Sequence, residues 1–239
     1  QLAFDVAFDR LVAACRNHGI SILTVRNGYT AGEIGYYVRR LANQNMIGLA
    51  FANAHALLAA APGLPKTYST NPLAFAVPLA HGKPPLLIDQ ASSATAFVNI
   101  ARAAAQGRAI PEGWAVDKDG KATTDPHKAM DGALLPFGGY RGANIALMVE
   151  MLSAGLSGAE WSTDAGNFRS GDACPKSGLT VIAINPGDGA PFIERATDQV
   201  DVLEGLGIHV PGQRRRPQAD MIEVPKPDLD AIVALAEQA

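Results

Sequence analysis

Residues 136–142, Pro-Phe-Gly-Gly-Tyr-Arg-Gly, have the residue types that bind anions, and they lead into an apolar segment that is typical of a helix. The first turn of a helix offers unpaired backbone N–H groups and the positive end of the helix dipole. Glycine lets the backbone approach a ligand closely, and arginine can grip a carboxylate through two hydrogen bonds. The segment predicts a phosphate or carboxylate site formed by Tyr140, Arg141 and Gly142. A plain turn before a core helix is the alternative.

Polar groups also follow an apolar, strand-like run at residues 86–88. Asp89 ends this run and is followed by Gln90, Ala91, Ser92 and Ser93. A carboxylate in this place could bind ribose hydroxyls, and the amides and hydroxyls after it could bind phosphate. The alternative is that Asp89 only caps a helix. Either serine could cap a helix that runs to Gln106.

A third polar segment precedes the apolar run 73–77. Thr70 and Asn71 come directly before Pro72 at the entrance to this predicted strand. The side-chain amide of Asn71 has two donors and one acceptor, which suits the orientation of a substrate. An ordinary turn before proline is the alternative.

Composition limits the classes of protein to which the chain can belong. The 239 residues are 48% hydrophobic and 18% charged, with a net charge of −3, which indicates a globular domain and argues against nucleic acid as a partner. No apolar run is long enough to predict a membrane span. The two cysteines, Cys15 and Cys174, lie in unrelated contexts, which predicts neither a zinc site nor a disulfide framework and favours a reducing, cytoplasmic compartment.

Strand and helix patterns alternate along the chain, which predicts the α/β class. Apolar residues at helical spacing from Phe4 to Cys15 predict a first helix that ends near Gly19. A turn is expected at Asn27–Gly28, and a buried helix after Gly142. The remaining expected strands are residues 20–25, 47–51 and 179–184, and the remaining helices are residues 35–44, 192–206 and 227–239.

Five segments in one order resemble motifs of the type-2 malate/L-lactate dehydrogenase family. Residues 69–78 are similar to its Gly-Thr-Asn-Pro strand, residues 87–93 to its Asp-Met-Ala-Thr-Ser segment, and residues 110–126 contain two parts of another long signature. Residues 138–142 resemble its Gly-Gly-His-Lys-Gly element, and residues 210–215 its Pro-Gly-Glu-Arg element. A single match would be weak, but five in the family's order indicate membership.

This resemblance implies a large mixed β-sheet flanked by helices, unlike the Rossmann fold, and a homodimer with the active site near the subunit interface. It implies that residues 1–72 belong to a substrate and dimerisation domain and residues 73–185 to an NAD(P)-binding domain. Residues 186–239 would pack back on the first domain.

NADH or NADPH is the implied cofactor, contacted by residues 89–93, residues 140–142 and a third group, Gly212, Gln213 and Arg214. An exposed turn is the alternative for that third group. Asp89 would repel a 2′-phosphate, whereas the arginines from Arg214 to Arg216 would attract one, so the choice between NADH and NADPH stays open.

The chain departs from the family where a proton donor is expected. The family often has a histidine in an Asn-His-Phe-Gly segment, and Thr30 occupies that place here, while Arg141 replaces a lysine. His55, which follows a predicted strand, is expected at the surface. A 2-oxo acid needs a proton donor for the alkoxide that forms, whereas a protonated cyclic imine already carries its proton.

The residues therefore favour reduction of a cyclic 2-imino acid of the Δ1-pyrroline- or Δ1-piperideine-2-carboxylate type, with Thr30, Asn71 and Arg141 at the reacting centre. A 2-oxo acid is the second substrate class. A non-redox binding protein on the same scaffold is the alternative function.

The family also has an N-terminal region with a Ser-His-Gly motif that has no counterpart in this sequence. The apolar face of the first helix, with Phe4, Phe8, Leu11 and Val12, is expected to need a partner surface. We therefore expect that an N-terminal companion segment or chain completes the active site.

Overall fold

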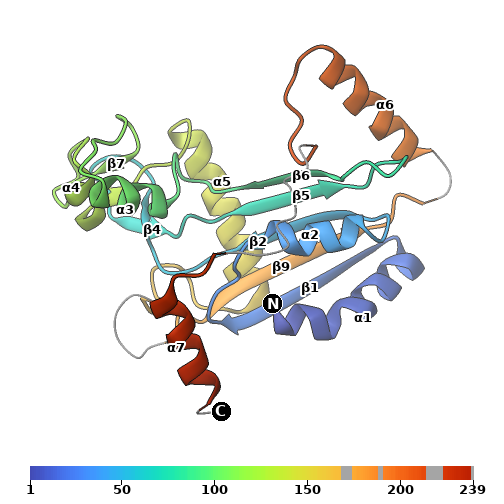
Figure 1. Ribbon diagram of the computed structural model, residues 1–239, viewed down its shortest axis with the longest axis horizontal. Helices are drawn as coiled ribbons and strands as arrows, with labels where there is room; N and C mark the ends of the chain where they lie inside the picture. The colour runs from blue at the N-terminus through green and yellow to red at the C-terminus, as the bar shows by residue number, and fades with distance from the viewer. Residues whose placement is uncertain (168–173, 188–190, 214–222, 238–239) are drawn as a thin grey trace.

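The computed structural model describes residues 1–167, 174–187, 191–213 and 223–237. Its centre is a five-stranded sheet in the order β1-β9-β2-β5-β6, in which all neighbouring strands are antiparallel (Figure 1). The strands are β1 (Ile20–Gly28), β2 (Ile47–Ala52), β5 (Leu73–Val77), β6 (Leu86–Gln90) and β9 (Ser177–Ile184). Strand β9 comes late in the chain but pairs with both β1 and β2, so the sheet joins distant parts of the sequence.

Two helices, α1 (Leu2–His18) and α2 (Gly35–Ala42), cover one face of this sheet. Gly19 ends α1 in the left-handed conformation, with its N–H donated to the carbonyl of Cys15 at 2.8 Å. The rings of Phe4 and Tyr37, one from each helix, meet edge to face with centroids 4.9 Å apart. Below them the sheet presents mostly small side chains to the helices, among them Ala50, Ala74, Ala76, Val181 and Ala183.

The opposite face of the sheet carries large aliphatic and aromatic side chains. The strand register places one row of five across all five strands: Ile22, Ile182, Leu49, Phe75 and Ile88. No member of this row is fully buried, and Ile22 is 54% exposed. Helix α5 (Tyr140–Glu150) and the π-helix η1 (Met151–Gly155) lie against the sheet at β2 and β9, where Thr180 donates to the carbonyl of Leu152.

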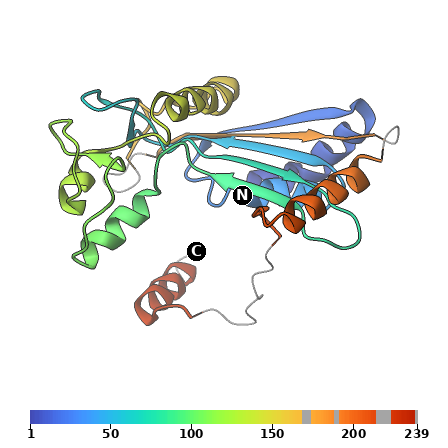
Figure 2. The ribbon, with the colours of Figure 1, turned by 90° about the horizontal axis from the view of Figure 1, so that it is seen from above.

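A smaller sheet stands at one end of the large one, in the order β4-β3-β8-β7 (Figure 2). Its strands are β3 (Leu58–Ala59), β4 (Lys66–Tyr68), β7 (Ala115–Val116) and β8 (Ala133–Leu134). Helices α3 (Phe97–Ala105) and α4 (Pro126–Asp131) share its core, which includes Leu58, Ile100 and Leu134. The pairing of β3 with β8 is the one parallel pairing among the strands that the structure describes.

Two further helices follow β9. Helix α6 (Phe192–Gly205) lies beside the turn between β5 and β6 (Figure 1). Helix α7 (Lys226–Ala236) has no buried residue and lies away from the large sheet (Figure 2). No helix in the described ranges is both long enough and apolar enough to cross a membrane.

The predicted class, α/β with sheets flanked by helices, is confirmed. The large sheet is not mixed as expected, because all of its described pairings are antiparallel and the parallel pairing of β3 with β8 lies in the small sheet. The first helix and its stop at Gly19, the strand at residues 73–77 and the buried strand β9 also agree with prediction. The strands β3, β7 and β8, of two residues each, were not predicted, because so few residues show no periodicity.

Four expectations about local structure are wrong. Asn27 and Gly28 do not end the strand: β1 continues to Gly28 through an irregularity in pairing, with Asn27 at φ 60°. Neither Ser92 nor Ser93 caps α3, which begins after Ala96. Helix α5 is not buried all round, because Leu147 and Met148 are exposed. His55 is buried and not at the surface.

The reason given for expecting an outside partner of α1, an uncovered apolar face, is also wrong. Phe4, Phe8, Leu11 and Val12 are all buried, because α2 and the sheet already cover that face.

The predicted division into residues 1–72, 73–185 and 186–239 stays a prediction. Its first boundary falls between β2 and β5, which are paired neighbours in one sheet. Strand β9, from the second segment, lies between β1 and β2 of the first.

Candidate active site

A cavity of about 270 Å³ opens at one end of the large sheet. Four segments form its walls: the loop after β1, the end of β2, the link between β4 and β5, and the start of β9. All its lining side chains are neutral, and the polar ones are Tyr29, Thr30, Asn53, Ser69, Thr70 and Ser177. The site therefore offers hydroxyl and amide groups. None of the described side chains that line it carries an imidazole, an amine, a guanidinium or a carboxyl group.

Two of the predicted residues, Thr30 and Thr70, come together in this cavity from segments forty residues apart. The hydroxyl oxygen of Thr30 accepts a hydrogen bond from the N–H of Gly32 at 3.2 Å, which shapes the loop after β1. Ser177 faces the same cavity and is 4% exposed. Its hydroxyl has no hydrogen-bond partner among the described residues, which is unusual for a buried polar group.

Asn71 lies behind the cavity wall and not in its lining. It is fully buried and has φ 37°, a left-handed conformation that asparagine adopts more readily than most residues. Its side-chain nitrogen donates to the carbonyl of Ala146 at 2.8 Å and to the carboxylate of Glu150 at 2.7 Å. These bonds direct the amide group toward α5.

The start of α5 has the properties predicted for an anion site. Its N-cap residue is Gly139, without a capping side chain, and Gly138 and Gly139 both have positive φ with open space where a side chain would stand. Tyr140 is 70% exposed, and the guanidinium carbon of Arg141 lies 5.8 Å from the centre of its ring. Gly142 has a packing reason to be glycine, because a side chain there would clash with the carbonyl of Phe137.

Asp89 caps a helix, but not the one that follows it in sequence. Its carboxylate accepts the N–H of Gly35, the first residue of α2, at 2.8 Å. Beside the start of α2 the carboxyl group loses part of its contact with water, which disfavours the charged form and raises the pKa of Asp89. The hydrogen bond from the N–H of Gly35 opposes that shift. Gln90 ends β6 and is exposed, and Ala91 is partly buried.

The two serines after them have internal partners, which explains why neither caps α3. The hydroxyl of Ser92 donates to the carbonyl of Asn71, and that of Ser93 to the carbonyl of Thr95, both at 2.7 Å. Ser93 also pairs with Pro136, and the carbonyl of Ser92 accepts the N–H of Phe137 at 3.1 Å. The segment from Asp89 to Ser93 therefore runs beside the glycine-rich approach to α5.

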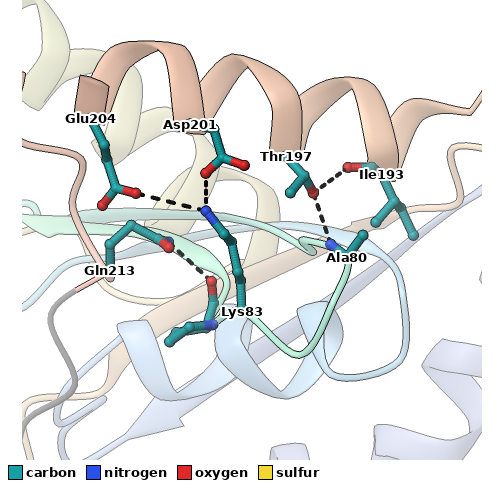
Figure 3. A network of polar contacts seen from close by, with 8 residues as sticks. Ala80, Lys83, Ile193, Thr197, Asp201, Glu204 and Gln213 are labelled. Atoms are coloured by element: carbon teal, nitrogen blue, oxygen red, sulfur yellow. Dashed lines mark hydrogen bonds and ion pairs between the residues drawn. The ribbon is translucent and has the colours of Figure 1, made fainter. Parts of the chain in front are cut away.

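The third predicted cofactor segment lies at the other end of β6. The N–H of Leu87 donates to the carbonyl of Pro211 at 3.1 Å, and the side chain of Gln213 donates to the carbonyl of Pro84 at 3.0 Å (Figure 3). Gly212, at φ 90°, sits so close to β6 that no side chain would fit. Arg214 lies outside the described residues.

An ionic contact holds α6 next to this segment. Lys83 pairs with Asp201 and lies 3.8 Å from the carboxylate of Glu204, both on α6 (Figure 3). The hydrogen bond that Lys83 donates to the carboxylate of Asp201 raises the pKa of Lys83. Thr197 accepts the N–H of Ala80 at 2.8 Å and completes the attachment of the helix to the turn between β5 and β6.

Three buried polar residues near the cavity were not predicted from the sequence: Asn53, Ser177 and Glu150. Asn53 directly follows β2, and an asparagine just after an apolar strand is a weak signal that the sequence does contain. Glu150 is the one carboxylate in the apolar run that follows Gly142, and a lone charge in such a helix is the clearest signal overlooked.

Comparison with known proteins places these features in a family. Residues 1–222 match the model of the malate/L-lactate dehydrogenase family, and the chain belongs to that family. It is 35% identical to a (2R)-3-sulfolactate dehydrogenase (NADP⁺) from Chromohalobacter salexigens, over 95% of this chain and 70% of the relative. It is 34% identical to a Δ1-pyrroline-2-carboxylate/Δ1-piperideine-2-carboxylate reductase from Pseudomonas putida, over 93% of this chain and 67% of the relative.

The fold has a counterpart among solved structures. A Δ1-piperideine-2-carboxylate reductase from Pseudomonas syringae pv. tomato superposes with a TM-score of 0.87 at 33% identity, over 98% of this chain and 73% of that one. The predictions of the family, of an oxidoreductase and of a nicotinamide cofactor are thereby confirmed. The relatives' names include cyclic 2-imino acids and sulfolactate, a 2-hydroxy acid whose oxidised form is a 2-oxo acid.

Proposed function

We propose that this chain reduces a small cyclic 2-imino carboxylate by hydride transfer from NADPH or NADH, with the substrate in the cavity beside Thr30 and Thr70. The observation that carries the proposal is the neutral lining of that cavity. A protonated cyclic imine brings its own proton and positive charge to the reaction, so hydroxyl and amide groups suffice to hold it. Reduction of a ketone requires a proton donor to the developing alkoxide.

The relatives support the same choice. Imino-acid reductases occur both among the sequences and among the structures most similar to this chain. A 2-oxo acid remains the second candidate, because a sulfolactate dehydrogenase is also a relative at comparable identity.

The start of α5 fits the phosphate part of a dinucleotide, because no side chain caps its first N–H groups and Arg141 adds a positive charge. The N–H of Gly142 is donated to the carbonyl of Phe137 at 3.0 Å, so Gly142 contributes by letting a ligand approach the backbone closely. We assign Tyr140, Arg141 and Gly142 to this contact, with residues 89–93 as the adjoining wall. Gly212 and Gln213 are a further proposed contact along β6, and Arg214 belongs to the same assignment. When bound, the cofactor supplies the hydride, and these residues bind and orient it.

In the proposed active site, Thr30 and Ser177 contact the substrate directly. Ser177 is the stronger of the two assignments, since its buried hydroxyl has an unused hydrogen-bonding capacity that a ligand would satisfy. Asn71 acts from behind the wall by fixing the position of Thr70. Arg141 is assigned to a phosphate or carboxylate group and not to proton transfer.

The open face of the large sheet supports a homodimer or a companion segment. The row of five apolar side chains that crosses this face, with Ile22 at one end and Ile88 at the other, forms a continuous apolar surface. Continuous exposed apolar surfaces usually mark a contact with a partner. We propose a homodimer through this face, with an N-terminal companion segment as the alternative occupant. The cytoplasmic location predicted from the cysteines stays a prediction.

The test is an assay of NADPH and NADH oxidation with Δ1-pyrroline-2-carboxylate, Δ1-piperideine-2-carboxylate, pyruvate and oxaloacetate. We expect the cyclic imines to have the higher kcat/KM, and we expect no gain from Thr30→His. A clear preference for the open-chain acids would contradict the proposal. Turnover of neither class, together with no binding of either cofactor, would favour the non-redox alternative.

A further inference from the structure

Glu150 is a buried carboxylate that the proposed chemistry does not use. It is the last residue of α5, and the π-helix η1 begins at the next residue. The residue is 4% exposed, and no ion pair to it occurs within the described part of the chain. Burying a carboxylate without compensation costs several kcal/mol at least, so its hydrogen bonds must offset that cost.

Three hydrogen-bond donors converge on this carboxylate. One oxygen accepts the backbone N–H of Ser162 at 2.6 Å, and the other accepts the hydroxyl of Ser162 at 2.8 Å and the side-chain amide of Asn71 at 2.7 Å. All three groups donate, so the site requires a group that only accepts.

The bond to Asn71 connects Glu150 to one wall of the cavity. Asn71 lies between Thr70 and Pro72, which both line the cavity, and its backbone is in the left-handed region. The carbonyls of Thr70 and Asn71 accept the N–H and the hydroxyl of Ser92, at 2.8 Å and 2.7 Å. The same turn therefore also fixes the segment proposed to adjoin the cofactor.

The bonds to Ser162 connect Glu150 to the opposite wall. The hydroxyl of Ser162 accepts a hydrogen bond from the amide of Asn53 at 3.4 Å, and Asn53 in turn accepts the N–H of Gly178 at 2.8 Å. Asn53 lines the cavity, and Gly178 follows Ser177 directly. One carboxylate thus links the turn at Thr70 with the strand ends at Asn53 and Ser177.

We infer that Glu150 is a positioning residue of the active site, which sets the spacing of the cavity walls through Asn71 and Ser162. This inference rests on the proposed function, because it takes the cavity to be the substrate site. A π-helix at the next residue agrees with this role, since π-turns inserted in α-helices occur frequently at functional sites.

Glu150→Gln tests the inference, because it keeps the shape of the side chain and replaces one acceptor oxygen by a donor. The new N–H₂ group must face a donor, so one of the three bonds is lost and the walls shift. We expect kcat/KM for the preferred substrate to fall about tenfold or more, mainly through KM, at a temperature where circular dichroism shows the variant folded. The Kd for NADPH, measured by fluorescence, should change much less.

Ser153→Ala is the matched control. Ser153 is also fully buried, and its hydroxyl donates to the carbonyl of Val149 at 2.7 Å, but this bond does not lead to the cavity. The control should lower Tm and leave KM and kcat unchanged. If Glu150→Gln behaves like this control, Glu150 is only structural and the inference is overturned.

Two further measurements keep the outcome decisive. If Glu150→Gln does not fold, Ser162→Ala removes the hydrogen bond to Asn53 with a smaller change and should still raise KM. An unchanged KM in that variant overturns the inference.

If the wild type turns over neither substrate class, the proposed function fails. The Kd of pyrrole-2-carboxylate, a planar cyclic probe, then replaces KM as the quantity measured. A wild type that neither turns over substrate nor binds this probe overturns both.

Discussion

The two faces of the five-stranded sheet differ in the size of the side chains that they carry. On the face under α1 and α2, alanines such as Ala50, Ala74 and Ala76 let the helices approach closely, and the bulk is supplied by the helices. On the other face the strands themselves supply bulk, with Ile22, Leu49 and Phe75 in register. The small side chains lie on the face that helices of the same chain cover, and the large side chains lie on the face that is suited to a partner.

The covered face should be the more sensitive to substitution. Phe4 is fully buried between α2 and the sheet, so Phe4→Ala should lower the free energy of unfolding by about 3–5 kcal/mol, measured by urea denaturation. Val6 lies on the same helix but is 77% exposed, and Val6→Ala should change stability by no more than about 0.5 kcal/mol. Similar losses for both variants would show that α1 is not packed as described.

Arg141 tests the start of α5, the proposed cofactor contact. Arg141→Ala should weaken binding of the cofactor or of the substrate carboxylate by about 1.5–3 kcal/mol, because it removes a charge-assisted hydrogen bond. Fluorescence titration with NADPH and steady-state KM values separate the two ligands. Unchanged Kd and KM would remove Arg141 from the site.

The open face should affect association more than folding. Ile22→Asp places a charge in the apolar row and should weaken a homodimer through this face by about 2 kcal/mol, while the stability of the monomer changes little. Sedimentation velocity over a range of concentrations measures the effect, with Val6→Asp as a control on the far side of α1. A wild type that is monomeric at all concentrations would contradict the proposed dimer.

Ser177 tests the point where β9 reaches the cavity. Ser177→Ala should raise KM for the substrate severalfold, equivalent to about 1 kcal/mol for one hydrogen bond, and should leave Tm nearly unchanged because the hydroxyl has no partner among the described residues. An unchanged KM would indicate that this hydroxyl does not contact the substrate.

Asp89, at the edge of the covered face, should give the smallest effect. Its pKa is raised in the folded protein, so unfolding releases a proton, and this carboxyl group lowers stability as pH rises from 3.8 through its folded pKa. Asp89→Asn keeps an acceptor for Gly35 and should be at least as stable as the wild type at pH 7. That advantage should vanish below pH 3.8, which thermal melts across pH would show.

The sequence alone determined the local elements and the family. Gly19 ends α1 because glycine readily takes the left-handed conformation found there, and the apolar run from Leu73 to Val77 forms β5 as predicted. Five short motifs in order were enough to indicate the malate/L-lactate dehydrogenase family.

Tertiary structure decided which groups these residues meet. Asp89 caps α2 and not α3, Asn71 reaches Glu150, and Asn53 meets Ser162, across separations of 54, 79 and 109 residues. Local patterns report neighbours within a few positions, so they cannot contain such contacts. The cavity itself arises because β9 inserts between β1 and β2, and that pairing follows from burying apolar strands against each other, which no short motif specifies.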